Sequence, residues 1–269
     1  MTSTQTLPPA PGPSGGPGSP DGDRSGAAAI RIATVVVGGL VALVAVVAVA
    51  IGQFGVASVR TDFAQQAIPA QIRSIDVSTE VGDIEVTRTP GAEPGVEFDL
   101  RGPFWNRPRV PAVEISGDEL TIGAEDPRRC LFFCGGAVTV RIELGDLELD
   151  ALDLESEVGD VRVRDVVARE ITASSSVGDV VVQSAETPTI EARSEVGSIE
   201  IRPLATTRSI TATSNVGSIT VLVPSGIEYD VQVSSDVGDV SVGIPTAPSA
   251  PRSIVATSDI GDVRIAPER

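Results

Sequence analysis

Carboxylates recur at one fixed place in this sequence, directly after a glycine. The aspartates at this place are Asp83, Asp146, Asp160, Asp179, Asp239 and Asp262. Oxygen-rich groups of this kind suit calcium, and Asp160 and Asp179, held one repeat apart, would resemble the carboxylate pair of a polysaccharide hydrolase. However, Ser198 and Ser218 occupy two positions of the same series. Since serine replaces aspartate readily when the task is to cap a turn, we expect neither catalytic residues nor a metal site.

Other reactive side chains are sparse. The chain has no histidine and only two cysteines, Cys130 and Cys134. Serine nucleophiles would therefore lack a histidine base, and two thiols fall short of the four ligands of a structural zinc site. The formal net charge of −17 opposes nucleic-acid binding, which depends on clustered positive charge. We expect a protein that is not an enzyme, holds no cofactor and has no nucleic-acid partner.

The aspartates belong to a phrase that returns until the C-terminus. It reads apolar-x-apolar-x-Ser-x-Val-Gly-Asp/Ser-Val-x-Val, and its first clear copy is Leu152–Val163. A fixed period of about 20 residues is the mark of a repeat architecture. Less regular copies upstream place Gly82 and Gly145 at the same turn. The glycines of the later copies are 19 to 23 residues apart: Gly159, Gly178, Gly197, Gly217, Gly238 and Gly261.

Each phrase contains two alternating apolar runs with the glycine between them. Alternation places the apolar side chains on one face of a strand, and glycine suits the turn because it reaches positive φ without a Cβ penalty. A unit this short cannot bury its apolar face alone, so successive units must stack, strand above strand. The sequence predicts an all-β fold, a parallel β-solenoid whose repeats occupy residues 138–269. The serines would form a hydrogen-bonded ladder beside the bend: Ser156, Ser175, Ser194, Ser214, Ser235 and Ser258.

The N-terminal residues differ from the repeats in composition. Residues 1–29 are rich in Pro, Gly and Ser, which predicts a disordered tail. Ile32–Ile51 is uncharged over the length that spans a bilayer core of about 30 Å, and residues 30–59 are predicted to form a transmembrane helix. A cleaved signal peptide is the alternative, because Ala48–Ala50 resembles a cleavage site. The long leader and the long apolar run favour the uncleaved anchor.

The orientation of this anchor follows from several weak signals. Arg24 and Arg31 precede the apolar segment and Arg60 and Arg73 follow it, so the positive-inside rule is nearly balanced. The two lone thiols, the acidic β-rich domain and the single apolar span favour a cytoplasmic N-terminus. The C-terminal domain would then lie outside the cytoplasm.

The segment between the anchor and the regular repeats is expected to be irregular. Residues 60–70 are interpreted as a linker, and residues 71–137 as a β-rich cap segment that covers the first coil. Within it, alternating residues on both sides of Ser116-Gly117-Asp118 predict a hairpin. At the other end, Pro245–Pro251 lengthens the turn before the last phrase. We expect that last phrase to end the stack, where Pro267 would block further strand addition.

Two loops of the cap segment concentrate aromatic residues. Phe104 and Trp105 lie in the first, and the second holds two phenylalanines between Cys130 and Cys134. The favoured interpretation is that the aromatics plug the N-terminal end of the stack. The alternative is a contact patch for a partner protein, a glycan or a lipid surface. A disulfide between the cysteines would stiffen the short loop without stabilising the domain greatly. The residues of this proposed patch are Phe104, Trp105, Phe132 and Phe133.

The Ser-x-Val-Gly-Asp-Val-x-Val phrase, following one apolar segment and an irregular cap, resembles the bacterial putative-adhesin family. The resemblance covers about residues 70–265, and the matching residues are those of turns and core. It implies a parallel β-solenoid at the cell envelope, related to the head domains of adhesin-like proteins, and in some relatives an association with envelope-stress operons. No catalytic residues carry over, since the family offers none. The use of arginine without lysine agrees with a GC-rich bacterial genome.

Together these features predict a function in binding. We expect a non-enzymatic, membrane-anchored, adhesin-like module in the bacterial plasma membrane, with an envelope protein or glycan as its partner. The alternative is an envelope-stress regulatory component that works through its tail or its membrane helix.

The predicted orientation can be measured on intact cells with a membrane-impermeant thiol reagent. If the C-terminal domain lies outside the cytoplasm, Cys130 and Cys134 should be labelled after reduction without breaking the cells. A cytoplasmic protein serves as the control for cell integrity. Labelling that appears only after lysis would contradict the orientation.

Overall fold

The computed structural model describes residues 59–103, 110–123 and 137–268, all of which fall in one compact unit, Ala57–Arg269. In these ranges every regular element is a β-strand, and none of them holds a helix with the length and apolarity of a membrane span. The predicted tail and nearly all of the predicted transmembrane helix, residues 1–58, lie outside the described residues.

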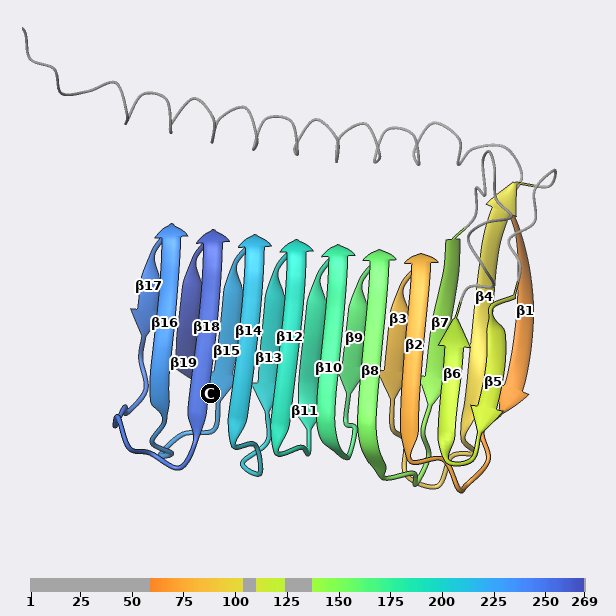
Figure 1. Ribbon diagram of the computed structural model, residues 1–269, viewed down its shortest axis with the longest axis horizontal. Coiled ribbons are helices and arrows are strands. Elements are labelled where there is room, and N and C mark those ends of the chain that lie inside the picture. The colour runs from red at the N-terminus through yellow and green to blue at the C-terminus, as the bar shows by residue number, and fades with distance from the viewer. Residues whose placement is uncertain (1–58, 104–109, 124–136, 269) are drawn as a thin grey trace, which may run out of the picture. The chain divides into compact units, whose positions relative to one another are not determined.

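The strands form two facing sheets (Figure 1). Sheet A contains ten strands and sheet B nine, and each regular coil contributes one strand to each sheet. The pairing between coils is parallel and in register, so that Ile171 lies between Leu152 and Ile190. This arrangement confirms the predicted all-β fold with parallel stacking of the repeats. The regular coils are β8 Leu149–Val158 with β9 Val161–Arg164, β10 Ala168–Val177 with β11 Val180–Ala185, β12 Thr189–Val196 with β13 Ile199–Pro203, and β14 Ser209–Val216 with β15 Ile219–Val223.

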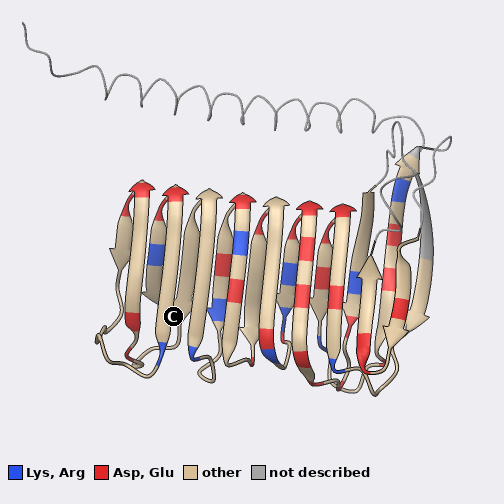
Figure 2. Ribbon diagram, viewed as in Figure 1, with Lys and Arg blue, Asp and Glu red and all other residues tan. Residues whose placement is uncertain are grey.

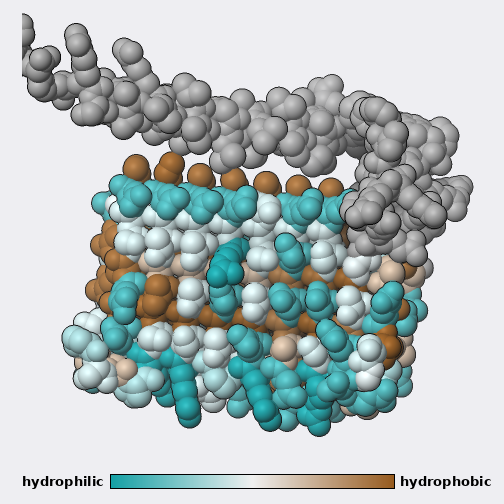
Figure 3. Space-filling view, viewed as in Figure 1, coloured by the Kyte–Doolittle hydropathy of each residue, from teal (hydrophilic) through white to brown (hydrophobic). Residues whose placement is uncertain are grey.

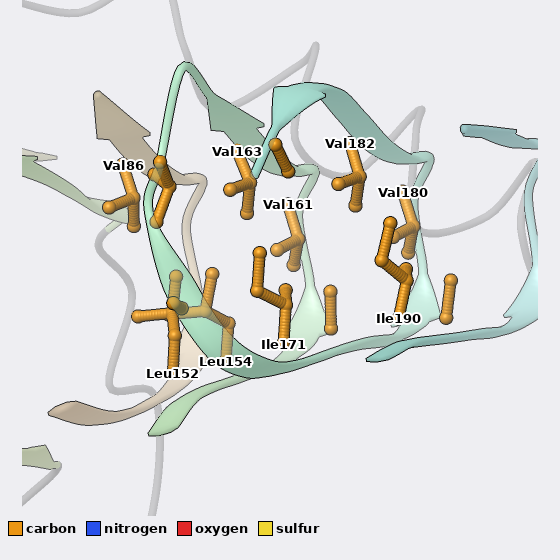
Figure 4. Close-up of a cluster of buried hydrophobic side chains, with 14 of the residues drawn as sticks. Val86, Leu152, Leu154, Val161, Val163, Ile171, Val180, Val182 and Ile190 are labelled. Atoms are coloured by element: carbon orange, nitrogen blue, oxygen red, sulfur yellow. The ribbon is translucent and has the colours of Figure 1, made fainter. Parts of the chain in front are cut away.

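The core lies between the two sheets and consists mainly of aliphatic side chains (Figure 4), with Phe98 and Tyr229 as buried aromatic members. In the coil of β10 and β11, Ile171, Ala173, Val180 and Val182 are all fully buried. Burial of a valine or isoleucine contributes roughly 1.5–3 kcal/mol, and the same contribution recurs in every coil. The alternating pattern of the phrase is therefore the pattern of the core.

The glycine of each phrase forms the corner between the sheets, and it is required for two reasons. Gly197 has a φ of +153°, a conformation that other residues rarely adopt. A Cβ at Gly197 would also lie 2.0 Å from the carbonyl oxygen of Gly178 in the neighbouring coil. The φ requirement was expected from the sequence, whereas the close approach of the backbones follows from the stacking. Seven glycines share this geometry: Gly82, Gly159, Gly178, Gly197, Gly217, Gly238 and Gly261.

Gly145 was grouped with these corners, and the structure corrects that assignment. Its φ is +56°, and a Cβ there would meet the carbonyl oxygen of Ala92. Asp146 accepts a hydrogen bond from the amide of Gly91 at 3.2 Å. Gly145 therefore belongs to a turn of the N-terminal cap and not to the glycine column.

The N-terminal cap is built from antiparallel strands. β4 (Gly95–Pro103) pairs antiparallel with both β1 (Val59–Ala67) and β7 (Ala137–Glu143). β1 therefore occupies most of the segment that was interpreted as a linker. β5 (Ala112–Ser116) and β6 (Glu119–Gly123) form the predicted hairpin.

The first copy of the phrase, placed by the sequence in the cap, is a full coil of the stack. Its strands are β2 (Ser74–Val81) and β3 (Ile84–Thr87), which pair in parallel with β8 and β9. The chain leaves this coil, builds the cap on one side of it, and returns on the other side with β8.

The order of the last two coils differs from the sequence order. β18 (Ser253–Ile260) and β19 (Val263–Pro267) lie between the coil of β14 and β15 and the coil of β16 (Asp230–Val237) and β17 (Val240–Val242). The expectation that the last phrase ends the stack is therefore wrong. The long Pro-rich connection allows the chain to pass back over the end coil, and Pro267 lies beside Val223 inside the stack rather than guarding its end.

The close approach of the corners predicts a large effect of Gly197→Val. The variant should lose at least about 1–3 kcal/mol of unfolding free energy, because it adds backbone strain and a clash with Gly178. Gly123→Val is the matched control, since a Cβ at Gly123 meets nothing within 4 Å. Chemical denaturation measures both, and equal losses in the two variants would contradict the role of the corner.

Candidate functional site

The serine column joins neighbouring coils through its hydroxyl groups. The Oγ of Ser175 donates to the carbonyl oxygen of Gly159 at 2.8 Å, and the Oγ of Ser194 donates to that of Gly178 at 2.9 Å. The structure confirms the predicted serine ladder and shows that each hydroxyl binds a glycine carbonyl of the next coil. The hydroxyls of this column are engaged in stacking, and all of these serines are buried except the half-buried Ser235. The column consists of Ser156, Ser175, Ser194, Ser214, Ser235 and Ser258.

The aspartates after the glycines are also engaged between coils. Asp160 accepts a hydrogen bond from the amide of Asp179 at 2.8 Å, and Asp179 accepts one from the amide of Ser198 at 2.7 Å. Arg162 contacts the other carboxylate oxygen of Asp160 at 2.6 Å. Where serine replaces aspartate, the Oγ of Ser218 takes the same acceptor position. The geometry at Ser218 explains how serine can replace aspartate in this column.

This use of the carboxylates bears on the chemistry that the sequence left open. Asp160 and Asp179 lie one coil apart, but each carboxylate is held by a backbone amide instead of facing a partner across a cleft. Within the described ranges, no group of three or more histidine, cysteine, aspartate or glutamate side chains is placed to hold a metal ion. The repeat motif therefore serves the fold, and functional groups must be sought on the outward faces.

The predicted aromatic patch and cysteine pair lie outside the described residues. Phe104 and Trp105 fall in residues 104–109, and Cys130, Phe132, Phe133 and Cys134 fall in residues 124–136. Their expected roles remain predictions. The described strands do show that both loops leave the N-terminal cap, since β4 ends at Pro103, β6 ends at Gly123 and β7 begins at Ala137.

The outward face of sheet A carries charges of both signs in contact. Glu85 lies 3.5 Å from both Arg141 and Arg164, and Glu200 lies 2.8 Å from Arg202. The contacts of Glu85 are cross-strand pairs of opposite charge, which stabilise a sheet modestly, whereas Glu200 and Arg202 lie two residues apart on β13. The carboxylates of this face are therefore largely neutralised by their neighbours.

The outward face of sheet B differs, because two carboxylates lie side by side on β2 and β8 (Figure 2). Asp76 and Asp153 are direct partners in the parallel register, and neither makes an ion pair with another described residue. Partial burial raises the pKa of Asp153 above its usual value of 3.8, and the charge of Asp76 raises it further. Three more carboxylates add to the effect: Glu155, Glu170 and Glu191.

A line of apolar side chains runs along the edge of the stack where the sheet B strands reach their corners (Figure 3). Val177 lies in register with Val158 and Val196, and a valine or isoleucine occupies the same position in every coil. Val81 at one end is 38% exposed and Val237 at the other is 64% exposed. The residue before the apolar one is acidic in most coils, so the line is bordered by negative charge: Glu80, Glu157, Glu195, Asp236 and Asp259.

These features define the class of the protein as a parallel two-sheet β-solenoid with glycine corners. Residues 67–265 match the Toastrack DUF4097 family, and the chain belongs to that family. The outcome confirms the family resemblance and its all-β fold. No curated protein matches the chain.

Two solved structures are similar to this chain over most of their own length. A putative cell adhesion protein from Clostridium sporogenes aligns with a TM-score of 0.51 at 13% identity, covering 78% of this chain and 100% of that one. A putative adhesin from Bacteroides fragilis aligns with a TM-score of 0.40 at 16% identity, covering 78% of this chain and 97% of that one. At 13% identity, the similarity to the Clostridium sporogenes protein shows the fold alone.

The acidic pair on sheet B was not identified from the sequence, although a signal for it exists. Asp76 stands between Ile75 and Val77, and Asp153 stands between Leu152 and Leu154, at the same outward position of two copies. The sequence does not place these copies next to each other, because the residues of the cap lie between them. Only the topology shows that β2 and β8 are neighbours.

The raised pKa of Asp153 predicts that its ionised form destabilises the folded protein. Asp153→Asn should therefore raise the melting temperature at pH 7. The gain should shrink as the pH falls through the raised pKa, because the wild-type carboxyl then binds a proton in the folded state. Glu228→Gln, on an exposed loop at the other end of the stack, removes one charge as a control. An equal, pH-independent gain in both variants would contradict the local origin of the effect.

Proposed function

We propose that this chain is a non-enzymatic binding module that residues 30–59 anchor in a bacterial membrane, with the solenoid displayed outside the cytoplasm. The observation that carries the proposal is a division between the two sides of each strand. The inward and corner residues are engaged in stacking, whereas the outward residues are solvent-facing and change from coil to coil.

The variation is clearest along one row of sheet B. In register from β2 to β18, this row reads Asp76, Asp153, Thr172, Glu191, Thr211 and Val255. The buried row beside it stays aliphatic throughout, because the core admits little else. A surface whose composition is free to vary on a rigid scaffold is suited to recognition.

The envelope location is supported by the sequence and by similar folds. The uncharged segment Ile32–Ile51 has the length of a membrane span, and it precedes the described unit. The Clostridium sporogenes protein with the same fold is described as a putative cell adhesion protein. An adhesin-like role at the cell surface agrees with both.

The outward face of sheet B is the proposed contact surface. Sheet A neutralises its carboxylates internally, but Asp76 and Asp153 keep an unbalanced negative charge. A partner that brings cationic groups to this face relieves the repulsion, so the preferred partner is an envelope protein or glycan that carries positive charge.

Binding of the full chain in detergent to isolated cell envelopes tests this function. Combining Asp76→Asn with Asp153→Asn removes two exposed charge contacts worth about 0.5 kcal/mol each, which weakens binding roughly fivefold. The matched variant on sheet A combines Glu85→Gln with Glu200→Gln and should bind as the wild type does. Equal binding by all three proteins would exclude sheet B as the contact surface.

Two further variants separate the alternatives that the sequence left open. Replacing Phe104, Trp105, Phe132 and Phe133 with alanine should abolish envelope binding only if the aromatic loops form the contact patch. Deleting residues 1–29 should leave envelope binding intact but abolish the cellular phenotype if the protein is an envelope-stress component that acts through its tail.

A further inference from the structure

The end of the stack opposite the cap, formed by β16 and β17 and called the end coil, presents two open strand edges. β16 is the terminal strand of sheet B and β17 is the terminal strand of sheet A (Figure 1). In the interior, the amide of Gly261 donates to the carbonyl of Val237 at 2.9 Å, and that of Gly217 donates to Ile260 at 2.8 Å. No described strand lies beyond β16 in sheet B, so the equivalent amide of Gly238 has no backbone acceptor in the described part of the chain.

The core is also open at this end. Val240 and Val242 are 45% and 38% exposed, whereas their counterparts in the next coil, Val263 and Ile265, are at most 1% exposed. The end coil thus exposes apolar side chains that every other coil buries. A further two-strand layer would bury them.

The edges are only partly protected against strand pairing. Natural edge strands are protected by charged residues, prolines, bulges or short length. β16 carries Asp230 and Asp236 near its ends and β17 has three residues, but the middle of β16 carries Gln232 and Ser234 and β17 carries Ser241. Interior coils place charged residues at the same outward positions, including Asp153, Glu155 and Arg162. The end coil still carries Asp230, Asp236 and Asp239, so the register of a contact between two copies must keep these carboxylates apart.

The opposite end does not offer the same surface. Sheet A ends there in β1 and sheet B ends in β5, and both are antiparallel to their neighbours. A head-to-tail filament would require that end to present a coil of the repeat. The end coil therefore favours pairing with itself.

We propose that the open end is a dimer interface between two copies of this chain. The copies meet about a two-fold axis perpendicular to the sheets, with β16 antiparallel to β16 of the second copy and β17 antiparallel to β17. A partner must supply two strand edges with apolar side chains between them at the same separation. The end coil of a second copy has this shape by construction, and a two-fold contact closes on itself.

The neighbouring loop sets the register of this contact. Residues 245–247 lie beside the start of β16, where Tyr229 bridges to Thr246. The contact is therefore displaced toward the other half of β16, with Ser234 facing Ser234 of the second copy. Gln232 then faces Asp236 of the second copy, and no two carboxylates are directly opposed. This inference is independent of what the outward faces bind.

The mass of the full chain in detergent, corrected for bound detergent, tests the dimer. The wild type is expected to have the mass of two chains. Ser234→Asp places two carboxylates opposite each other at the axis and should raise the dimer dissociation constant at least tenfold. Thr213→Asp is the matched control, because Thr213 occupies the same outward row in an interior coil. A wild type with the mass of one chain would overturn the proposal.

A cysteine placed at the axis provides a second measurement that does not depend on a weakened variant. In a background of Cys130→Ser and Cys134→Ser, Ser234→Cys should form a disulfide-linked dimer under mild oxidation, and Thr213→Cys should not. A dimer that survives Ser234→Asp without this cross-link would overturn the end-to-end geometry. A mass that grows beyond two chains with concentration would overturn the closed two-fold contact.

Discussion

The fold depends on the close contact between glycine corners of adjacent coils. At each corner the backbone of one coil approaches the carbonyl of the next so closely that a Cβ would overlap it, as at Gly178 over Gly159. The hydroxyl of Ser175 donates to the same carbonyl, and the carboxylate of Asp160 accepts from the amide of Asp179 in the neighbouring coil. These contacts fix the height and register of every coil. Because the register is fixed, the small aliphatic residues meet in the core and the outward residues form straight rows.

This constraint separates structure from function within the phrase. The residues that make the repeat recognisable, Ser, Gly and Asp, are the ones that the coils use on each other. The residues that face solvent are the ones that the phrase leaves unspecified. The serine and aspartate motif is therefore structural. The proposed recognition uses outward positions such as Asp76 and Asp153, whose mutual repulsion is not relieved within the described chain.

Most of the fold was predictable from local pattern, but the order of the coils was not. Alternation and glycine spacing predicted the strands, the corners and the hairpin at Ser116–Asp118, because each depends on neighbouring residues. The antiparallel cap and the exchanged order of the last coils depend on which copies meet in space. All copies carry similar apolar faces, so pattern alone does not distinguish one neighbour from another. The extra length at Pro245–Pro251 was the only local sign of the exchange. The aromatic loops and the cysteine pair remain predictions from sequence.

The exchanged order also has a consequence for synthesis on the ribosome. β16 and β17 leave the ribosome before β18 and β19, yet they have no neighbour until those final strands insert beside them. The stack is therefore complete only once β18 and β19 have inserted between the two earlier coils. A stop codon after β17 would not simply remove the coil at the end of the stack. It would remove the coil of β18 and β19 and leave the coil of β16 and β17 without the strands that it pairs with. Chains that end after β17 should therefore be degraded by quality-control proteases.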